Sequence, residues 1–256
     1  MHKLLLSTAA FAALAGSAFA ADLPSVKEAP VIVAPTPVFT WTGFYVGADI
    51  GSGWANRGIS VPPGPLNPQD SFGTTARGIV GGGFAGYNYQ INQFVIGVQG
   101  DIQGADITGT SYSPLLDVTT SPNQNWLAAV NGRLGFVYDR ALIYAIGGVA
   151  FTDVSDNVSA GNLAAGFLLS NGIVPNSQKI SHSATGYDIG GGVEYAVAPN
   201  WTIRAEYRYY NFGSWTGNAS GWVPRTSDHT LNESTVTFGL SYLFGAQPVI
   251  PVLSKY

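Results

Sequence analysis

Apolar and polar residues alternate one by one along residues 235–244, near the end of the chain. The apolar positions are Val236, Phe238, Leu240, Tyr242 and Phe244. The positions between them are small or polar, namely Thr235, Thr237, Gly239 and Ser241. Because successive side chains of a β-strand point to opposite faces, this pattern predicts a strand with one apolar face and one polar face.

Seven more segments resemble it, so eight strands are predicted: 42–54, 77–89, 94–108, 126–138, 141–153, 185–197, 201–212 and 235–244. The clearest is 201–212, in which Ile203, Ala205 and Tyr207 alternate with charged residues. Segment 77–89 is rich in glycine and segment 141–153 is apolar throughout, so the facing of both is ambiguous. Each predicted strand has the roughly 9–11 residues that a tilted membrane-spanning strand needs.

The connections between the predicted strands alternate in length. Three are tight turns, at 90–93, 139–140 and 198–200, and four are long, at 55–76, 109–125, 155–184 and 213–232. Short periplasmic turns and long external loops are typical of outer-membrane barrels. We therefore predict an all-β fold: a closed, eight-stranded antiparallel up-and-down transmembrane β-barrel at 41–244, with both ends on the periplasmic side.

Composition favours this barrel over a soluble one. Only 10% of the residues are charged and 33 are glycine, whereas about a quarter of residues are charged in soluble proteins. The alternative is a lipocalin-like barrel with its apolar face inward. That arrangement crowds the aromatic residues into a small interior and leaves the outside sparsely charged.

The N-terminus predicts export. Lys3 precedes an apolar run, and the small residues Ala18 and Ala20 match a signal-peptidase site with cleavage after Ala20, so 1–20 is expected to be a signal peptide. A membrane anchor is the alternative, but the run is shorter than the roughly 20 residues of a spanning helix. Proline-rich residues 21–40 are expected to be a periplasmic linker and 245–256 a periplasmic tail. The predicted location is the outer membrane of a Gram-negative bacterium.

Charged residues on the polar strand faces are expected to lie inside the barrel. They form the predicted lumen charge network: Asp49, Asp101, Arg133, Asp188, Glu194, Arg204, Glu206 and Arg208. Since isolated buried charges are costly, opposite charges in a narrow interior are expected to pair and plug it. An ion path is the alternative interpretation.

Aromatic residues near strand ends are expected to form interface girdles in the lipid headgroup region. These residues are Trp41, Trp126, Trp201, Tyr87, Tyr138, Tyr195 and Tyr242. The third long connection carries an apolar patch at 163–169. It is expected to fold over the barrel mouth, extend strands beyond the membrane or bind a partner.

Other chemistry is weakly supported. The mature chain has only His182 and His229, which are interpreted as solvated loop histidines. The absence of cysteine excludes disulfides and thiolate sites, and a net charge of −4 is no reason to expect nucleic-acid binding. The runs 81–83 and 190–192 open no helix, so they are not phosphate loops. We expect no enzyme, no metal site and no cofactor.

Several motifs resemble one known family. The segments 41–47, 86–90, 95–101, 132–135, 190–195 and 204–209 are similar, in order and spacing, to the alphaproteobacterial outer-membrane proteins of the Omp25/Omp31 type, which are porin-like, OmpA-like barrels. Thr237, Gly239, Tyr242 and Phe244 resemble the signal read by the barrel-assembly machinery. Residues 245–256 depart from that signal, which usually ends the chain, and Pro248 and Pro251 argue against a ninth strand.

The resemblance implies an integral outer-membrane protein but no single agreed activity. The expected role is structural and at the surface, with a plugged lumen and exposed loops. The expected partners are outer-membrane lipid, the barrel-assembly machinery, and the cell wall or a host surface. The alternatives are a surface receptor or adhesin that could bind haem, then a narrow diffusion channel, and last an enzyme.

Overall fold

The computed structural model describes residues 39–61, 63, 69–114, 117–170, 178–217 and 227–245. The expected signal peptide, most of the expected linker at 21–40 and all but Gly245 of the expected tail lie outside these residues. Those three predictions therefore stay predictions.

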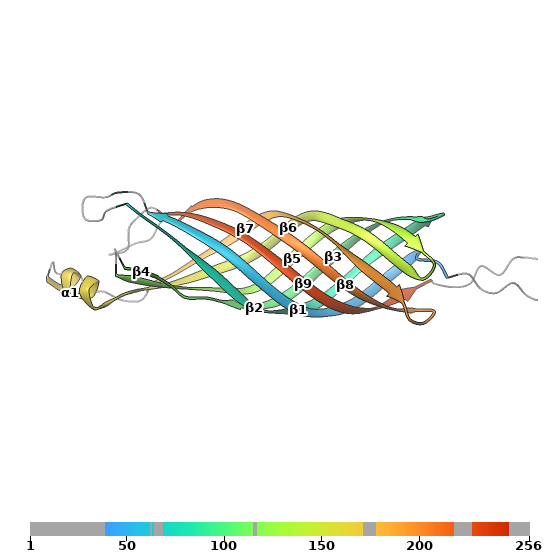
Figure 1. The fold of residues 1–256 in the computed structure, drawn as a ribbon, viewed down its shortest axis with the longest axis horizontal. Helices are drawn as coiled ribbons and strands as arrows, with labels where there is room; N and C mark the ends of the chain where they lie inside the picture. Colours follow the sequence, from blue (N-terminus) through green and yellow to red (C-terminus); the bar gives the residue numbers. More distant parts are fainter. Residues whose placement is uncertain are drawn as a thin grey trace, which may run out of the picture. The chain divides into compact units, whose positions relative to one another are not determined.

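Eight long strands close into an antiparallel ring (Figure 1). In chain order they are β1 (Gly43–Val61), β2 (Asp70–Ile91), β3 (Phe94–Thr108), β5 (Val118–Tyr138), β6 (Ala141–Ala160), β7 (Gln178–Ala196), β8 (Trp201–Gly217) and β9 (Ser227–Phe244). Each pairs with its neighbour, and β1 pairs with β9 to close the ring. A short strand, β4 (Ser111–Ser113), pairs only with β5 in the described residues. The predicted eight-stranded up-and-down barrel is confirmed.

The barrel turns apolar side chains outward and polar side chains inward, the reverse of a soluble protein. On β3, exposed and buried residues alternate without exception. The apolar side chain of Val98 is 61% exposed on the outer wall, while the neighbouring polar side chain of Gln99 is 2% exposed. Exposed apolar side chains cover the outer wall on all sides, and we call this surface the apolar band: Phe44, Val46, Ile50, Ile96, Val98, Ile102, Val130, Leu134, Ile143, Val149, Ile189, Val193, Ile203, Phe238 and Leu240. Such a surface suits the hydrocarbon of a membrane.

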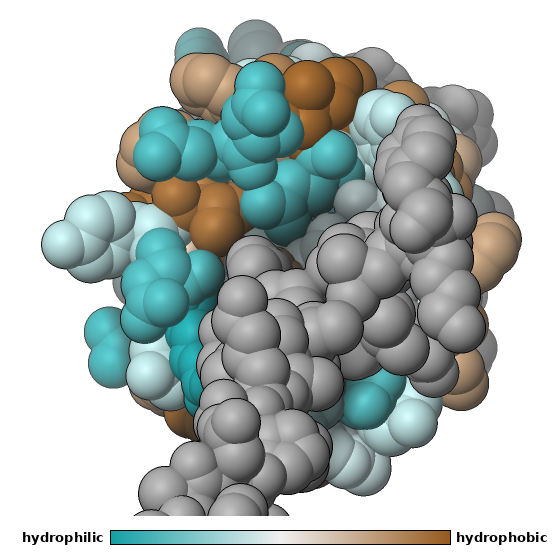
Figure 2. Space-filling model, turned by 90° about the vertical axis from the view of Figure 1, so that its right-hand side faces the viewer, coloured by the Kyte–Doolittle hydropathy of each residue, from teal (hydrophilic) through white to brown (hydrophobic). Residues whose placement is uncertain are grey.

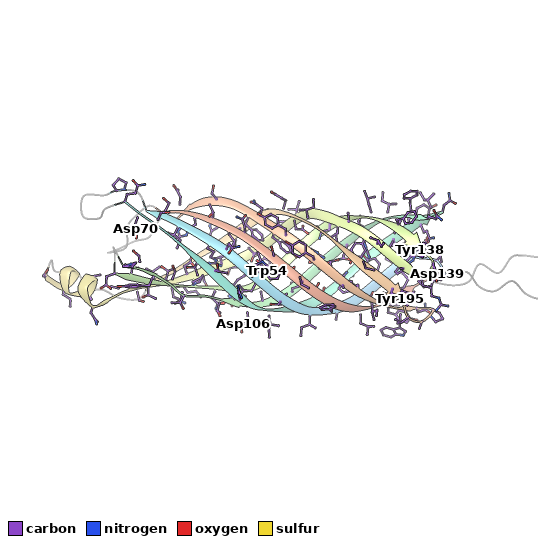
Figure 3. All side chains as sticks on the ribbon, viewed as in Figure 1. Trp54, Asp70, Asp106, Tyr138, Asp139 and Tyr195 are labelled. Carbon is purple, nitrogen blue, oxygen red and sulfur yellow. The ribbon has the colours of Figure 1, made fainter. Side chains whose placement is uncertain are left out.

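Tight turns gather at one end of the barrel. The β2–β3 and β5–β6 turns each begin at a residue with positive φ, Asn92 (55°) and Asp139 (53°), as tight hairpins require. Tyr138, Asp139 and Tyr195 lie at this end, and Asp70 lies at the other (Figure 3). Figure 2 looks onto the turn end, where hydrophilic and hydrophobic residues lie side by side on the visible part.

β3 has the bounds that the sequence predicted, but the other strands extend further towards the end opposite the tight turns. β2 has 22 residues and β5 has 21, whereas a tilted span needs about 9–11. The strands extend from both sides into the expected long loops at 55–76, 109–125, 155–184 and 213–232, so the barrel wall continues beyond the apolar band. Polar residues lie on both faces there because water reaches the outer face, and this removes the alternation from the sequence.

A helix was not expected, and the structure contains one. The apolar patch at 163–169 lies in α1 (Asn162–Ser170), at the end opposite the tight turns (Figure 1). Ala164 donates its backbone N–H to the Asp117 carboxylate (3.0 Å), which caps the first turn. None of the described helices is both long and apolar enough to cross a membrane.

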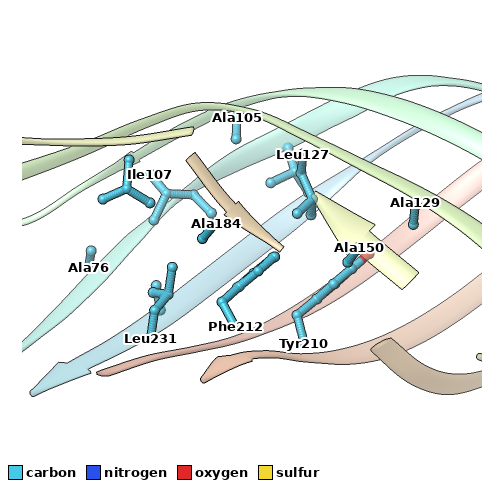
Figure 4. Packing of buried hydrophobic residues seen from close by; sticks show 13 residues of the cluster. Ala76, Ala105, Ile107, Leu127, Ala129, Ala150, Ala184, Tyr210, Phe212 and Leu231 are labelled. Atoms are coloured by element: carbon cyan, nitrogen blue, oxygen red, sulfur yellow. The ribbon is translucent and has the colours of Figure 1, made fainter. Parts of the chain in front are cut away.

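Apolar residues fill the barrel above and below its charged middle. Towards the external end they form a cluster that includes Ile107, Leu127, Tyr210, Phe212 and Leu231 (Figure 4). Towards the turn end, a second cluster contains Trp41, Val95, Leu142, Tyr144 and Ile146.

Candidate functional site

The candidate site is the barrel interior between these two apolar clusters. All eight residues of the predicted lumen charge network lie there, each between 1% and 8% exposed. They come from β1, β3, β5, β7 and β8. On β8, Arg204, Glu206 and Arg208 occupy alternate positions, so one strand delivers three charges to the same face. We call these eight residues the lumen charge cluster.

Arg204, on β8, contacts residues of β1 and β3, which are far away in the sequence. Its Nη2 donates to Asp49 Oδ2 at 2.8 Å, and its Nη1 donates to Gln99 Oε1 at 2.9 Å. Its guanidinium carbon lies 3.3 Å from the ring centroid of Phe84, a cation–π contact. A Cβ at Gly239 would lie 3.1 Å from Arg204 Nε, so the glycine leaves room for this side chain.

Arg208 is shared by three carboxylates. Its Nε donates to Glu206 Oε1 at 2.6 Å and its Nη1 donates to Asp101 Oδ1 at 2.9 Å. Asp188 Oδ2 lies 3.6 Å from the same Nη1. The guanidinium therefore links β3, β7 and β8.

Arg133 forms an ion pair with Glu194 and lies over the ring of Tyr144, with its guanidinium carbon 3.6 Å from the centroid. The Tyr144 hydroxyl donates to Glu206 Oε2 at 2.6 Å. Thr202 Oγ1 donates to Glu194 Oε1 at 2.5 Å. Through these hydrogen bonds, ion pairs and the cation–π contact of Arg133 with Tyr144, the three arginines belong to one network.

Sequence analysis missed several aromatic members of this network. Tyr45 and Tyr144 donate to Gln99 and Glu206, and Phe84 lies under Arg204. Phe84 and Tyr144 fall in the two segments whose facing was ambiguous. Their inward facing could have been inferred from strand pairing, because a residue opposite an inward-pointing charge points inward too. Phe84, for example, lies opposite Asp101.

A second ionic group lies at the external end, beyond the apolar band. Arg57 Nη1 donates to Asp156 Oδ1 at 2.9 Å, and both side chains are at least nine-tenths buried. His229 lines the same cavity of about 10 Å³, which has room for roughly one water molecule. Burial lowers the pKa of His229 below its ordinary value of 6.5.

The interpretation of both histidines as loop residues was wrong. His182 lies on β7 and is exposed, whereas His229 lies on β9 and is 8% exposed. The strands extend beyond the membrane, so positions that resembled loops belong to the wall. Their solvation was predicted correctly for His182 and wrongly for His229.

The expected aromatic girdle needs one correction. Tyr138, Tyr195 and Trp201 are exposed on the outer wall, at 76%, 46% and 44%, and Trp126 is 37% exposed. Tyr87 and Tyr242 are half-buried. Trp41 is only 1% exposed and packs in the apolar cluster at the turn end. It precedes β1, so strand alternation does not direct its side chain towards lipid.

The residues of the expected assembly signal lie on the last strand. Tyr242 and Phe244 contact each other with ring centroids 4.9 Å apart, and Phe244 is 51% exposed. Thr237 is buried and Gly239 is half-buried on the inner face. Recognition by the assembly machinery stays a prediction.

Comparison with known proteins gives the same fold. A family model described as an outer membrane protein β-barrel domain matches residues 6–244, which include the whole barrel and most of the segment before it. The chain belongs to the outer membrane β-barrel proteins. This barrel therefore lies in the outer membrane, and its apolar band faces lipid.

Two curated relatives are similar over almost all of this outer membrane barrel. The 31 kDa outer-membrane immunogenic protein of Brucella melitensis is 32% identical over 254 residues, which cover 95% of this chain and 100% of the relative. The 25 kDa outer-membrane immunogenic protein of Brucella abortus is 26% identical, covering 95% and 99%. These relatives support the resemblance to the Omp25/Omp31 type.

Among solved structures, Neisserial surface protein A aligns with a TM-score of 0.41 and 18% identity. The alignment covers 79% of this chain and 98% of that protein.

Proposed function

We propose that this protein is a closed, non-conducting barrel whose role is to hold polypeptide at the cell surface. The observation that carries the proposal is the lumen charge cluster, whose three arginines are each paired with a buried carboxylate. Paired charges of this kind hold side chains across the lumen instead of leaving a hydrated path.

The two apolar clusters support the same proposal. Leu127 and Leu231 are fully buried towards the external end, and Trp41 and Leu142 are buried towards the turn end. An ion that crossed the lumen would have to pass both clusters and the paired charges between them. Removal of its hydration water there would be costly.

Planar-bilayer recording tests this function. The purified full-length protein is expected to give no large, stable conductance steps at concentrations where a general porin in the same chamber does. A variant with Arg133→Ala and Tyr144→Ala removes two side chains of the barrier and is the matched positive control. Large, stable steps from the wild-type barrel would overturn the proposal.

A second candidate, surface recognition, is favoured by the part of the barrel beyond the apolar band. There the strands continue, and α1, which follows β6, has Leu169 58% exposed. The two Brucella relatives are named immunogenic, which agrees with exposure of the corresponding region. We propose that this region makes the contacts with other molecules, and that an adhesin or receptor role would reside there.

Haem is one ligand to test for such a receptor. His229 lines a cavity of about 10 Å³, so a porphyrin would need this end of the barrel to open, and exposed His182 is the more accessible ligand. Spectral titration with hemin, with His182→Gln as control, tests this role. Saturable binding that His182→Gln abolishes would support a haem receptor, and the absence of saturable binding would remove it.

A further inference from the structure

Acceptor oxygens without partners gather in one sector of the lumen. Among the described residues, four buried side-chain oxygens there accept no hydrogen bond: Asp101 Oδ2, Asn131 Oδ1, Asp188 Oδ1 and Asp188 Oδ2. The three side chains are 7%, 2% and 3% exposed. Buried acceptors are nearly always satisfied in folded proteins, so a group of four requires an explanation.

The strand register places these side chains on neighbouring parts of the inner wall. Asn131 lies opposite Gly148, and Gly148 lies opposite Asp188 on the next strand. A Cβ at Gly148 would lie 2.5 Å from Asn131 Oδ1. The amide oxygen therefore lies over this glycine, on the strand between Asn131 and Asp188. Asp101 and Asp188 both contact Arg208 Nη1, at 2.9 and 3.6 Å. Asp101 Oδ1 and Asp188 Oδ2 are therefore at most about 6.5 Å apart, and the unpartnered Asp101 Oδ2 belongs to the same carboxylate.

Charge points to the same sector. The lumen charge cluster contains five carboxylates and three guanidinium groups, an excess of two negative charges in a space of low polarity. Buried uncompensated charge is costly, so the folded barrel has a reason to take up a positive ion. Arg208 Nη2 also lacks a hydrogen-bond partner. Asn131 Nδ2 lacks one as well. Hydrogen bonds from these neutral or already counted donors do not remove the excess of two negative charges.

We propose that Asp101, Asn131 and Asp188 form a binding site for one hard, oxygen-preferring cation. Two carboxylates and an amide oxygen are the ligands that Na⁺, K⁺ and Ca²⁺ prefer, and water completes their coordination. The described residues contain no group of three or more His, Cys, Asp or Glu with metal-ligand geometry, so the amide oxygen of Asn131 is an essential third ligand. The bound ion links β3, β5 and β7 and offsets the negative charge of the cluster that its three arginines do not neutralise.

Cation-dependent stability tests the site. Full-length protein is dialysed into cation-depleted detergent buffer, and its urea unfolding midpoint is measured in NaCl, KCl, CaCl₂ and choline chloride at equal ionic strength. Ligand that binds only the folded state raises the midpoint with the logarithm of its concentration. At least one small cation is expected to do so, whereas choline, too large for the site, is not. The NaCl and CaCl₂ series distinguish a monovalent from a divalent ion.

Two variants separate coordination from general screening. Asp188→Asn keeps the shape and removes one charge, and Asn131→Leu keeps both carboxylates and removes the amide oxygen. Each is expected to raise the half-saturating cation concentration at least tenfold. Asp106→Asn, on the exposed face of β3, is the matched control and is expected to leave it unchanged. If Asp188→Asn fails to fold, Asn131→Leu still decides.

Three results would overturn the proposal. They are equal midpoints in choline and in every small cation, unchanged cation dependence in Asn131→Leu, and an infrared band of a protonated carboxyl group that Asp188→Asn removes. The last result would show that a proton, not a metal cation, neutralises the excess charge. None of these outcomes depends on conductance, so the site and the proposed closed barrel can fail separately.

Discussion

Arg204 and Asp49 meet inside the barrel with Nη2 and Oδ2 2.8 Å apart, although 155 positions separate them in the chain. β8 and β1 are not paired with each other, since β9 lies between them. The ion pair therefore crosses a strand, over the space that Gly239 leaves. It links β8 to β1 across β9, where the pairing of β1 with β9 closes the barrel.

Removal of one partner of this pair is expected to be strongly destabilising. Arg204→Met leaves the Asp49 carboxylate buried without its cation, and breaking a buried pair typically costs about 3–5 kcal/mol. Urea unfolding of protein reconstituted in vesicles measures the loss. Arg77→Met on the exposed face of β2 is the control, and its free energy of unfolding should change by less than about 0.5 kcal/mol.

The double variant tests whether the two residues act together. If they are coupled, Arg204→Met with Asp49→Leu should be less destabilised than the sum of the single variants, because no unpaired charge remains. Additive losses would show that the pair does not contribute as a unit.

The apolar band predicts where a charge is tolerated. Val98 is 61% exposed within the band, while Thr108, at the end of β3, is exposed on the same face beyond it. Val98→Arg should destabilise the folded protein in vesicles by about 2–4 kcal/mol, and Thr108→Arg by about 0–1 kcal/mol. Similar effects of the two substitutions would mean that lipid does not cover Val98.

Two tryptophans should report different surroundings. Trp201 is 44% exposed on the outer wall and Trp41 is 1% exposed. In proteins that retain only one tryptophan each, lipids brominated in the acyl chains should quench the fluorescence of Trp201 strongly and that of Trp41 weakly. Strong quenching of Trp41 would place it in the lipid girdle that the sequence first indicated.

His229 predicts a dependence of stability on pH. Its pKa in the folded protein lies below the ordinary value of 6.5 because of burial, so the unfolded chain binds the proton more readily. Its contribution to stability is present above that value and is lost as pH falls below it towards the folded pKa. Arg57, Asp156, Asp228 and His182 set its electrostatic surroundings.

The unfolding midpoint between pH 7.5 and pH 5 measures this effect. His229→Gln should reduce the loss of stability on acidification, and His182→Gln, on the exposed face of β7, should not. An unchanged pH dependence in His229→Gln would show that the histidine is not desolvated.

Strand alternation made most of the membrane-spanning fold predictable. In the middle of β3, β8 and β9, at 98–103, 203–208 and 235–242, apolar residues alternate with polar ones apart from single glycines, so both strand and facing follow from the sequence there. On β6 the contrast is absent, because Leu142 and Tyr144 point inward and Ile143 points to lipid. Hydrophobicity cannot separate a lipid-facing wall from an apolar lumen cluster.

Two other features could not be derived in this way. Strand extensions outside the membrane have polar residues on both faces, since each face meets water or buried polar groups, and they resembled loops. The partner of each charge depends on barrel shear. Arg208 reaches Asp101, 107 positions away, and no local pattern encodes that pairing.

The most direct test of the account is the alternation of surroundings along β9. The chain contains no cysteine, so a single cysteine at each position from 235 to 244 carries one spin label. In vesicles, electron paramagnetic resonance compares collisions with lipid-soluble oxygen and with a water-soluble nickel chelate. Labels at Val236, Phe238 and Leu240 should collide mainly with oxygen, and labels at Thr237 and Ser241 with neither. The opposite alternation, with Thr237 and Ser241 facing lipid or water and Phe238 enclosed, would contradict a barrel that turns its apolar face outward.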